Sequence, residues 1–104
     1  MASTRLEALK SMVEQQPGVS FLRYGLAMEY RNGGELEAAL TEFRALLTVD
    51  PDYSAAYFQG GQTLERLGRP DEARELYQAG IEVTSRKGES HARDELRAAL
   101  EMLG

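Results

Sequence analysis

Apolar residues recur along this chain at the three- and four-residue spacing of amphipathic helices, interrupted by glycine and proline. The segments between these interruptions predict helices at residues 3–16, 20–32, 35–49, 53–67, 70–87 and 89–103. Proline interrupts a helix because it lacks an N–H donor, and glycine accepts the backbone conformations of tight turns. The expected fold class is therefore all-α, with about six helices in one domain of 104 residues.

Two stretches of the chain, residues 20–53 and 54–87, are related by an interval of 34 residues. The positions that correspond at this interval include Ser20 and Ser54, Tyr24 and Phe58, Gly34 and Gly68, Ala39 and Ala73, and Phe43 and Tyr77. A fixed period of this length is typical of stacked repeats, because a single helix pair cannot bury its apolar faces alone. The flanking helices 3–16 and 89–103 would then complete the core at the two ends.

The two stretches resemble the tetratricopeptide repeat, whose helix–turn–helix unit has this length. The residues that carry the resemblance are Leu26, Ala27, Tyr30, Gly34, Ala39, Phe43 and Pro51 in the first stretch and Tyr57, Gly61, Gly68, Ala73 and Tyr77 in the second. The sequence departs from the family pattern at Arg23, Gly60, Gly80 and Ser85. The resemblance implies a short right-handed α-solenoid of antiparallel helix pairs, built from a half-repeat (3–16), two repeats (20–53 and 54–87) and a capping helix (89–103).

The resemblance also implies that the first helix of each repeat lines a concave, apolar groove. The candidate binding residues on these helices are Phe21, Tyr24, Met28 and Arg31 in the first repeat and Ala55, Phe58, Gln62 and Glu65 in the second. Tyr24 and Phe58 are the expected anchors, because aromatic side chains carry much of the energy at protein interfaces. The alternative is that Phe21, Tyr24 and Met28 pack beneath the neighbouring helix or loops. A subfamily that clamps carboxylates has a basic residue and an asparagine where this chain has Tyr24 and Met28, so that function is not expected.

Charge and composition narrow the class of partner. Acidic residues outnumber basic ones 17 to 12, and the net charge of −5 opposes binding to nucleic acid or to an anionic membrane surface. No apolar run approaches the roughly 20 residues that cross a bilayer, and the first residues do not form a signal peptide. Cysteine is absent, which excludes a disulfide framework and a thiolate zinc site. We expect a cytoplasmic protein of bacterial origin.

Residues suited to catalysis or metal binding are sparse. His91 is the only histidine, and together with Glu95 it could supply two ligands where a structural zinc site takes four. No serine lies in a G-x-S-x-G motif, and acid pairs such as Asp94 and Glu95 lie on charged helices, which is typical of solvated surface. We therefore expect no catalytic residues, no cofactor and no metal site.

Four glycines fall inside predicted helices, where each costs up to about 1 kcal/mol relative to alanine. They are Gly25, Gly60, Gly61 and Gly80. Close approach of neighbouring helices would offset that cost, and we favour this explanation over room for a ligand beside Phe58.

The sequence therefore predicts a non-catalytic adaptor that binds a peptide or helix of a partner protein in its groove. The alternative is a self-associating assembly protein, in which the groove or the end helix packs against another copy to give a weak homo-oligomer. The identity of the partner does not follow from the fold, because specificity depends on a few groove residues.

Overall fold

The computed structural model describes residues 4–104, which form six α-helices and no strand. The helices are α1 (Thr4–Gln15), α2 (Ser20–Asn32), α3 (Leu36–Val49), α4 (Ser54–Arg66), α5 (Pro70–Lys87) and α6 (Ser90–Leu103). The expected all-α fold is confirmed, although residue 3 of the first predicted helix lies outside the described part of the chain. None of these six helices combines the length and apolar character that a membrane span requires.

The turns within the two helix pairs have the same hydrogen bonds. Gly34 follows α2 with φ at +82°, and Gly68 follows α4 with φ at +73°, a left-handed conformation that glycine adopts without strain. The next amide in each turn bonds back to the helix, from Glu35 to the carbonyl of Tyr30 at 2.9 Å and from Arg69 to the carbonyl of Leu64 at 2.9 Å. This local chemistry ends both helices at matching positions of the 34-residue period.

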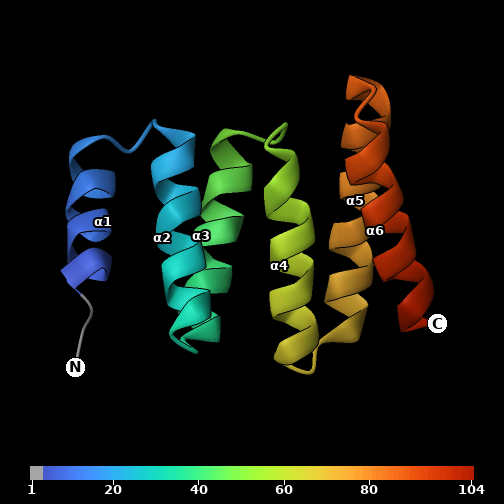
Figure 1. Cartoon of the computed structure of the whole chain (residues 1–104), viewed down its shortest axis with the longest axis horizontal. Coiled ribbons are helices and arrows are strands. Elements are labelled where there is room, and N and C mark those ends of the chain that lie inside the picture. The colour runs from blue at the N-terminus through green and yellow to red at the C-terminus, as the bar shows by residue number, and fades with distance from the viewer. Residues whose placement is uncertain (1–3) are drawn as a thin grey trace.

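The six antiparallel helices follow one another across the longest dimension of the molecule (Figure 1). Each helix packs against the next, and α4 also packs against α6. The molecule is correspondingly elongated, with extents of 37 × 28 × 19 Å. In the view of Figure 1, α2, α4 and α6 lie in front of α3 and α5, so these three helices form one face of the stack.

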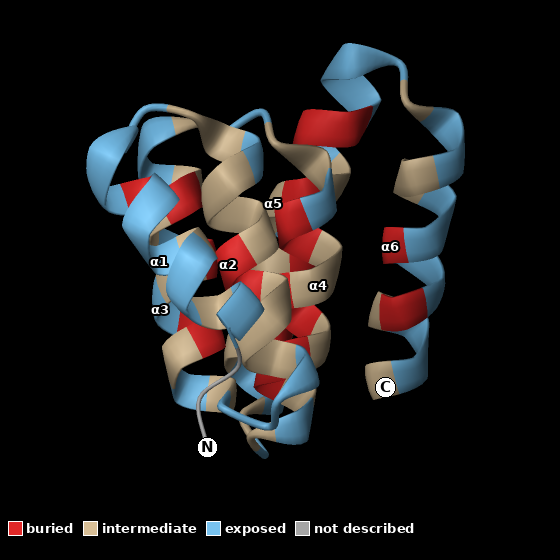
Figure 2. Ribbon diagram, turned by 60° about the vertical axis from the view of Figure 1, so that its left-hand side comes forward, coloured by how far each residue is buried: buried red, intermediate tan, exposed pale blue. Residues whose placement is uncertain are grey.

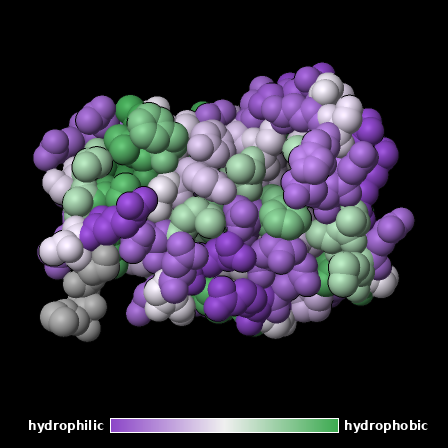
Figure 3. Space-filling view, in the orientation of Figure 1, coloured by the Kyte–Doolittle hydropathy of each residue, from purple (hydrophilic) through white to green (hydrophobic). Residues whose placement is uncertain are grey.

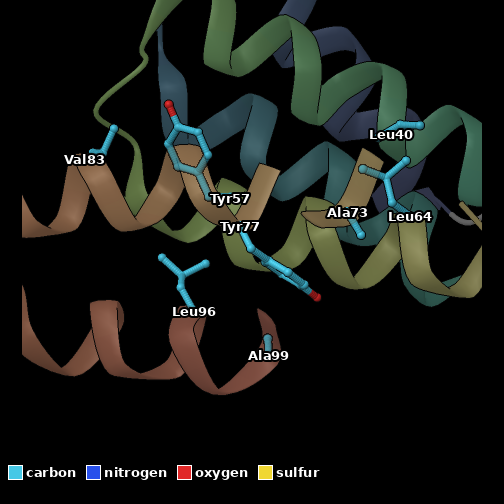
Figure 4. Packing of buried hydrophobic residues seen from close by; sticks show 8 residues of the cluster. All are labelled: Leu40, Tyr57, Leu64, Ala73, Tyr77, Val83, Leu96 and Ala99. Atoms are coloured by element: carbon cyan, nitrogen blue, oxygen red, sulfur yellow. The ribbon is translucent and has the colours of Figure 1, made fainter. Parts of the chain in front are cut away.

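Buried apolar residues form two clusters that run through the stack. The first joins α2, α3 and α4 and contains Ala27, Ala39, Phe43, Leu46 and Ala56. The second extends from α3 to α6 and contains Leu40, Tyr57, Leu64, Ala73, Tyr77, Val83, Leu96 and Ala99 (Figure 4). Figure 2 shows that the buried residues of α6 lie on the side that faces α4 and α5, so this last helix covers the end of the core.

Glycines bring α4 and α5 close together. A Cβ atom at Gly61 would overlap the ring of Tyr77, and a Cβ atom at Gly80 would lie 2.6 Å from the Cβ of Tyr57. The space beside each glycine is thus filled by an aromatic side chain of the other helix. The structure agrees with close helix approach as the reason for these glycines, and the density of the contact offsets their low helix propensity.

The second helix pair differs from the first in the length of its second helix. Helix α5 has 18 residues and α3 has 14. Pro51 disfavours the helical conformation at Asp50, whereas Ser85, at the equivalent position 34 residues later, lets α5 continue to Lys87. As a result α6 begins 36 residues after α4, although α4 begins 34 residues after α2. The ends of α5 and α6 therefore extend beyond the end of α4 (Figure 1).

Candidate functional site: a groove between α4 and α6

A groove of about 750 Å³ lies between α4 and α6. It is lined by Ser54, Ala55, Phe58 and Gln59 of α4, by Ser90, His91, Ala92, Glu95 and Leu96 of α6, and by Asp52, Tyr53, Lys87 and Glu89 of the segments that precede these helices. All of these residues belong to the N-terminal halves of the two helices or to the adjoining connections, which lie at the upper end in Figure 1. The additional turn of α5 positions the start of α6 above the start of α4 and so forms one wall of this groove.

The apolar part of the groove is supported from beneath by a fully buried tyrosine. Phe58 is half-buried, and the centroid of its ring lies 6.4 Å from that of Tyr77. The Tyr77 hydroxyl donates a hydrogen bond to Glu65 and accepts one of 2.6 Å from Gln62 Nε2. Burial, followed by the interaction with Glu65, raises the pKa of Tyr77 well above its usual value, so the hydroxyl remains a donor. Tyr77 therefore holds Phe58 on a rigid base.

Ionic contacts join the two connections at the end of the groove. Arg86 Nη2 lies 2.6 Å from Asp52 Oδ1, and Lys87 Nζ donates a 2.7 Å hydrogen bond to the Asp52 carbonyl. Glu89 accepts a hydrogen bond from the Ser54 hydroxyl and lies 3.4 Å from Lys87 Nζ. These hydrogen bonds, from Arg86 and from Ser54 respectively, lower the pKa of Asp52 and of Glu89, so both carboxylates are ionised at neutral pH. The segments before α4 and α6 are thus fixed relative to each other.

The sequence pattern of the tetratricopeptide repeat matches residues 24–88, which is more than half of the chain and includes the α4 wall of the groove. This chain belongs to the tetratricopeptide repeat (TPR) family. A TPR repeat-containing protein of Pseudomonas aeruginosa is 26% identical over 98 residues, which cover 94% of this chain and 93% of that protein. The fold of the family is that of a protein–protein interaction module, and its members are generally non-catalytic.

Solved structures share the same stack of helices. A TPR domain protein from Salinibacter ruber is 36% identical, with a TM-score of 0.80 and coverage of 85% of this chain and 89% of that chain. The Bordetella parapertussis protein BPP2914 is 31% identical, with a TM-score of 0.83 and coverage of 99% and 89%. The Yersinia enterocolitica type III secretion translocator chaperone SycD has a TM-score of 0.87 at 16% identity, with coverage of 94% and 68%, and shares the fold.

The structure separates the sequence-based candidates on the second TPR unit. Ala55 and Phe58 line the groove. Gln62 and Glu65 lie on the following turns of α4, outside the groove, and hold the hydroxyl of Tyr77. These two polar residues position the aromatic base of the site rather than line it.

The candidates on the first TPR unit lie on α2 and do not line this groove. Tyr24 is half-buried, with its ring centroid 6.1 Å from that of Phe43 and 5.2 Å from that of Tyr53. Met28 packs against the same cluster, and Arg31 Nη1 donates a 2.5 Å hydrogen bond to Gln59 Oε1 of α4. For Tyr24 and Met28 the structure thus agrees with the alternative that these side chains contribute to packing.

Phe21 differs from the other α2 candidates because 66% of its surface is exposed. Figure 3 shows hydrophobic surface over the upper parts of α1 and α2, and Met12 and Phe21 are the large exposed apolar residues of these helices. This surface is separate from the residues that line the groove between α4 and α6.

Replacing Tyr24 by alanine should lower the free energy of unfolding by about 1–3 kcal/mol, less than the roughly 3–5 kcal/mol of a fully buried aromatic residue. The same replacement at Phe21 should change it by at most about 0.5 kcal/mol, because that side chain is mostly exposed. Urea denaturation followed by circular dichroism measures both variants. Equal stability of the two variants would show that Tyr24 is not part of the packed structure.

The α6 wall of the groove was not among the candidates from the sequence. Its residues are His91, Ala92, Glu95 and Leu96. The 34-residue period gives the wrong alignment here, because the longer α5 shifts α6 by two residues relative to the preceding repeats. Ser85 in place of the family proline is the signal that could have shown this shift.

Residues 4–104 contain no group of three or more histidine, aspartate and glutamate side chains arranged to hold a metal ion. His91 Nε2 lies 3.8 Å from the nearest carboxylate oxygen of Glu95, with 93% of the histidine side chain exposed. The polar chemistry of the groove is therefore that of carboxylates and one lysine beside an apolar surface.

Proposed function

We propose that this TPR chain is a binding module that takes up a short segment of another protein in the groove between α4 and α6. The observation that carries the proposal is the half-buried ring of Phe58, which lines an open groove of about 750 Å³ and rests on the buried ring of Tyr77. A volume of this size is within the roughly 300–1,000 Å³ of typical ligand sites.

The geometry favours a peptide or helical segment as the ligand. The groove is open and runs between two helices, so a chain can enter it along the helices and place alternate or successive side chains against Phe58 and Leu96. The ionic contacts of Asp52 with Arg86 and of Glu89 with Lys87 hold the end of the groove in place before binding. A preformed site of this kind reduces the entropy lost on association.

Replacement of Ala55 by arginine provides a direct test, because Ala55 is an exposed residue of the groove wall. Short peptides of random sequence are selected by display against the unmodified chain, and their affinities are measured by fluorescence anisotropy. We expect Ala55→Arg to weaken binding at least about tenfold, which corresponds to about 1.4 kcal/mol. The long side chain would occupy the groove without disturbing the core.

Gln78→Arg is the matched control, because Gln78 is an exposed residue of α5 that adds the same charge away from the groove. Its affinity for the selected peptides should stay within about twofold of the unmodified chain. Circular dichroism verifies that both variants are folded. Peptides that bind Ala55→Arg as well as the unmodified chain would place the binding site elsewhere and refute the proposed function.

A further inference from the structure

The groove carries more negative than positive charge. Asp52, Glu89 and Glu95 line it, whereas Lys87 is its only cationic side chain apart from a histidine that is charged only when protonated. The chain as a whole has a net charge of −5. Charged segments that approach the groove are therefore attracted when they are basic and repelled when they are acidic.

The three carboxylates of the groove differ in how far they are already paired. Asp52 is held by Arg86, and Glu89 is held by Lys87 and Ser54. The charge on these two residues is thus largely balanced within the protein.

Glu95 has no comparable partner. Its charged neighbour within the described residues is His91, at 3.8 Å, which is too long for a hydrogen bond. The basic residue two positions before it, Arg93, pairs with Asp94 instead. The side chain of Glu95 is 53% exposed, so its carboxylate is open to a cation that enters the groove.

Glu95 stands beside the apolar surface of the groove. Ala92, Glu95 and Leu96 are separated by three and four residues along α6 and therefore lie on one face of that helix. Phe58 faces them from α4 across the groove. A ligand that fills this space thus meets an apolar wall and one unbalanced carboxylate side by side.

We propose that the partner segment places an apolar side chain against Phe58 and Leu96 and a lysine or arginine against Glu95. This inference rests on the proposed function, and it adds the chemical class of the segment: apolar and basic, with the two kinds of side chain close together. A basic side chain offers the best complement, because it binds the open carboxylate while its methylene groups cover the adjacent apolar surface.

The test compares peptides selected by display from the same random library against the unmodified chain and against Glu95→Lys. We expect peptides for the unmodified chain to combine an aromatic or aliphatic residue with a nearby lysine or arginine. Selection against Glu95→Lys should replace the basic residue by aspartate or glutamate, because the charge at this position is reversed.

Affinities of one selected basic peptide provide the quantitative comparison. Glu95→Gln should weaken its binding by about two- to fivefold, the range of a partly exposed ion pair, and Glu95→Lys by about tenfold. Glu101→Lys is the control, because Glu101 is an exposed residue of α6 outside the groove with the same change of charge. That variant should stay within about twofold of the unmodified chain.

Different results would refute the two proposals. Selected peptides that lose affinity with Ala55→Arg, yet carry no basic residue or bind Glu95→Lys equally well, would refute the role of Glu95 and leave the groove as the binding site. Peptides enriched in acidic residues would refute it as well. If selection gives no peptide that is sensitive to Ala55→Arg, the proposed function itself fails, and this inference fails with it.

Discussion

Ending the chain at Gly88, which removes α6, is expected to abolish cooperative unfolding or to cause aggregation. Leu96 and Ala99 of α6 are buried and belong to the same cluster as Tyr77 and Val83 of α5, which would become exposed to water. At about 25 cal/mol for each Å² of apolar surface uncovered, the loss amounts to several kcal/mol. Small domains are stable by only about 5–15 kcal/mol, so this is a large fraction of the total.

Urea denaturation and size-exclusion chromatography with light scattering measure this effect, and two substitutions calibrate it in the full chain. Leu96→Ala should lower the free energy of unfolding by about 2–5 kcal/mol, because the side chain is fully buried. Met102→Ala should leave it within about 0.5 kcal/mol, because 89% of that residue is exposed. A truncated chain that stays monomeric and equally stable would contradict the role of α6 in the core and favour an interaction tail that packs against another copy.

Replacing Gly61 by alanine should destabilise the protein by about 1–3 kcal/mol or more, although alanine is the better helix former. The new methyl group would overlap the Tyr77 ring. That ring cannot move easily, because it is fully buried and its hydroxyl is hydrogen-bonded to both Gln62 and Glu65. The two helices would have to separate or the ring would have to leave its position.

Gly25→Ala makes the same change within α2 and separates the effect of packing from that of helix propensity. A Cβ atom at Gly25 would lie 3.4 Å from the Cδ2 atom of Leu9, the flexible end of a side chain. This variant should therefore be as stable as the unmodified chain or up to about 1 kcal/mol more stable. Thermal unfolding followed by circular dichroism compares the pair, and equal stabilities would show that α4 and α5 do not require a glycine at Gly61.

The helix boundaries could be predicted from the sequence to within one residue, because the signals that end these helices are local. Gly34, Gly68 and Pro51 act on the backbone within a few residues of their own position, and no knowledge of the tertiary structure is needed. The 34-residue interval then led to the fold, because only stacking of the repeated units buries their apolar faces.

The site was less accessible, because exposure depends on residues that are distant in the sequence. Tyr24 was the expected anchor on α2, yet its ring packs against Phe43 and Tyr53, which no pattern within α2 reveals. The α6 wall depends on the additional length of α5, and a single residue, Ser85, was the sequence signal for that change. Phe58 was identified because its repeat position and the groove coincide.

The most direct measurement of the central claim is a nuclear magnetic resonance titration of the ¹⁵N-labelled chain with a selected peptide. The account predicts that amide shift changes concentrate at residues 54–59 of α4 and 90–96 of α6, which line the groove. The Ala55→Arg variant should show no such changes at the same peptide concentration. Shift changes confined to α1 and α2 around Phe21, with residues 90–96 unaffected, would contradict the account and assign binding to the apolar surface at that end of the stack.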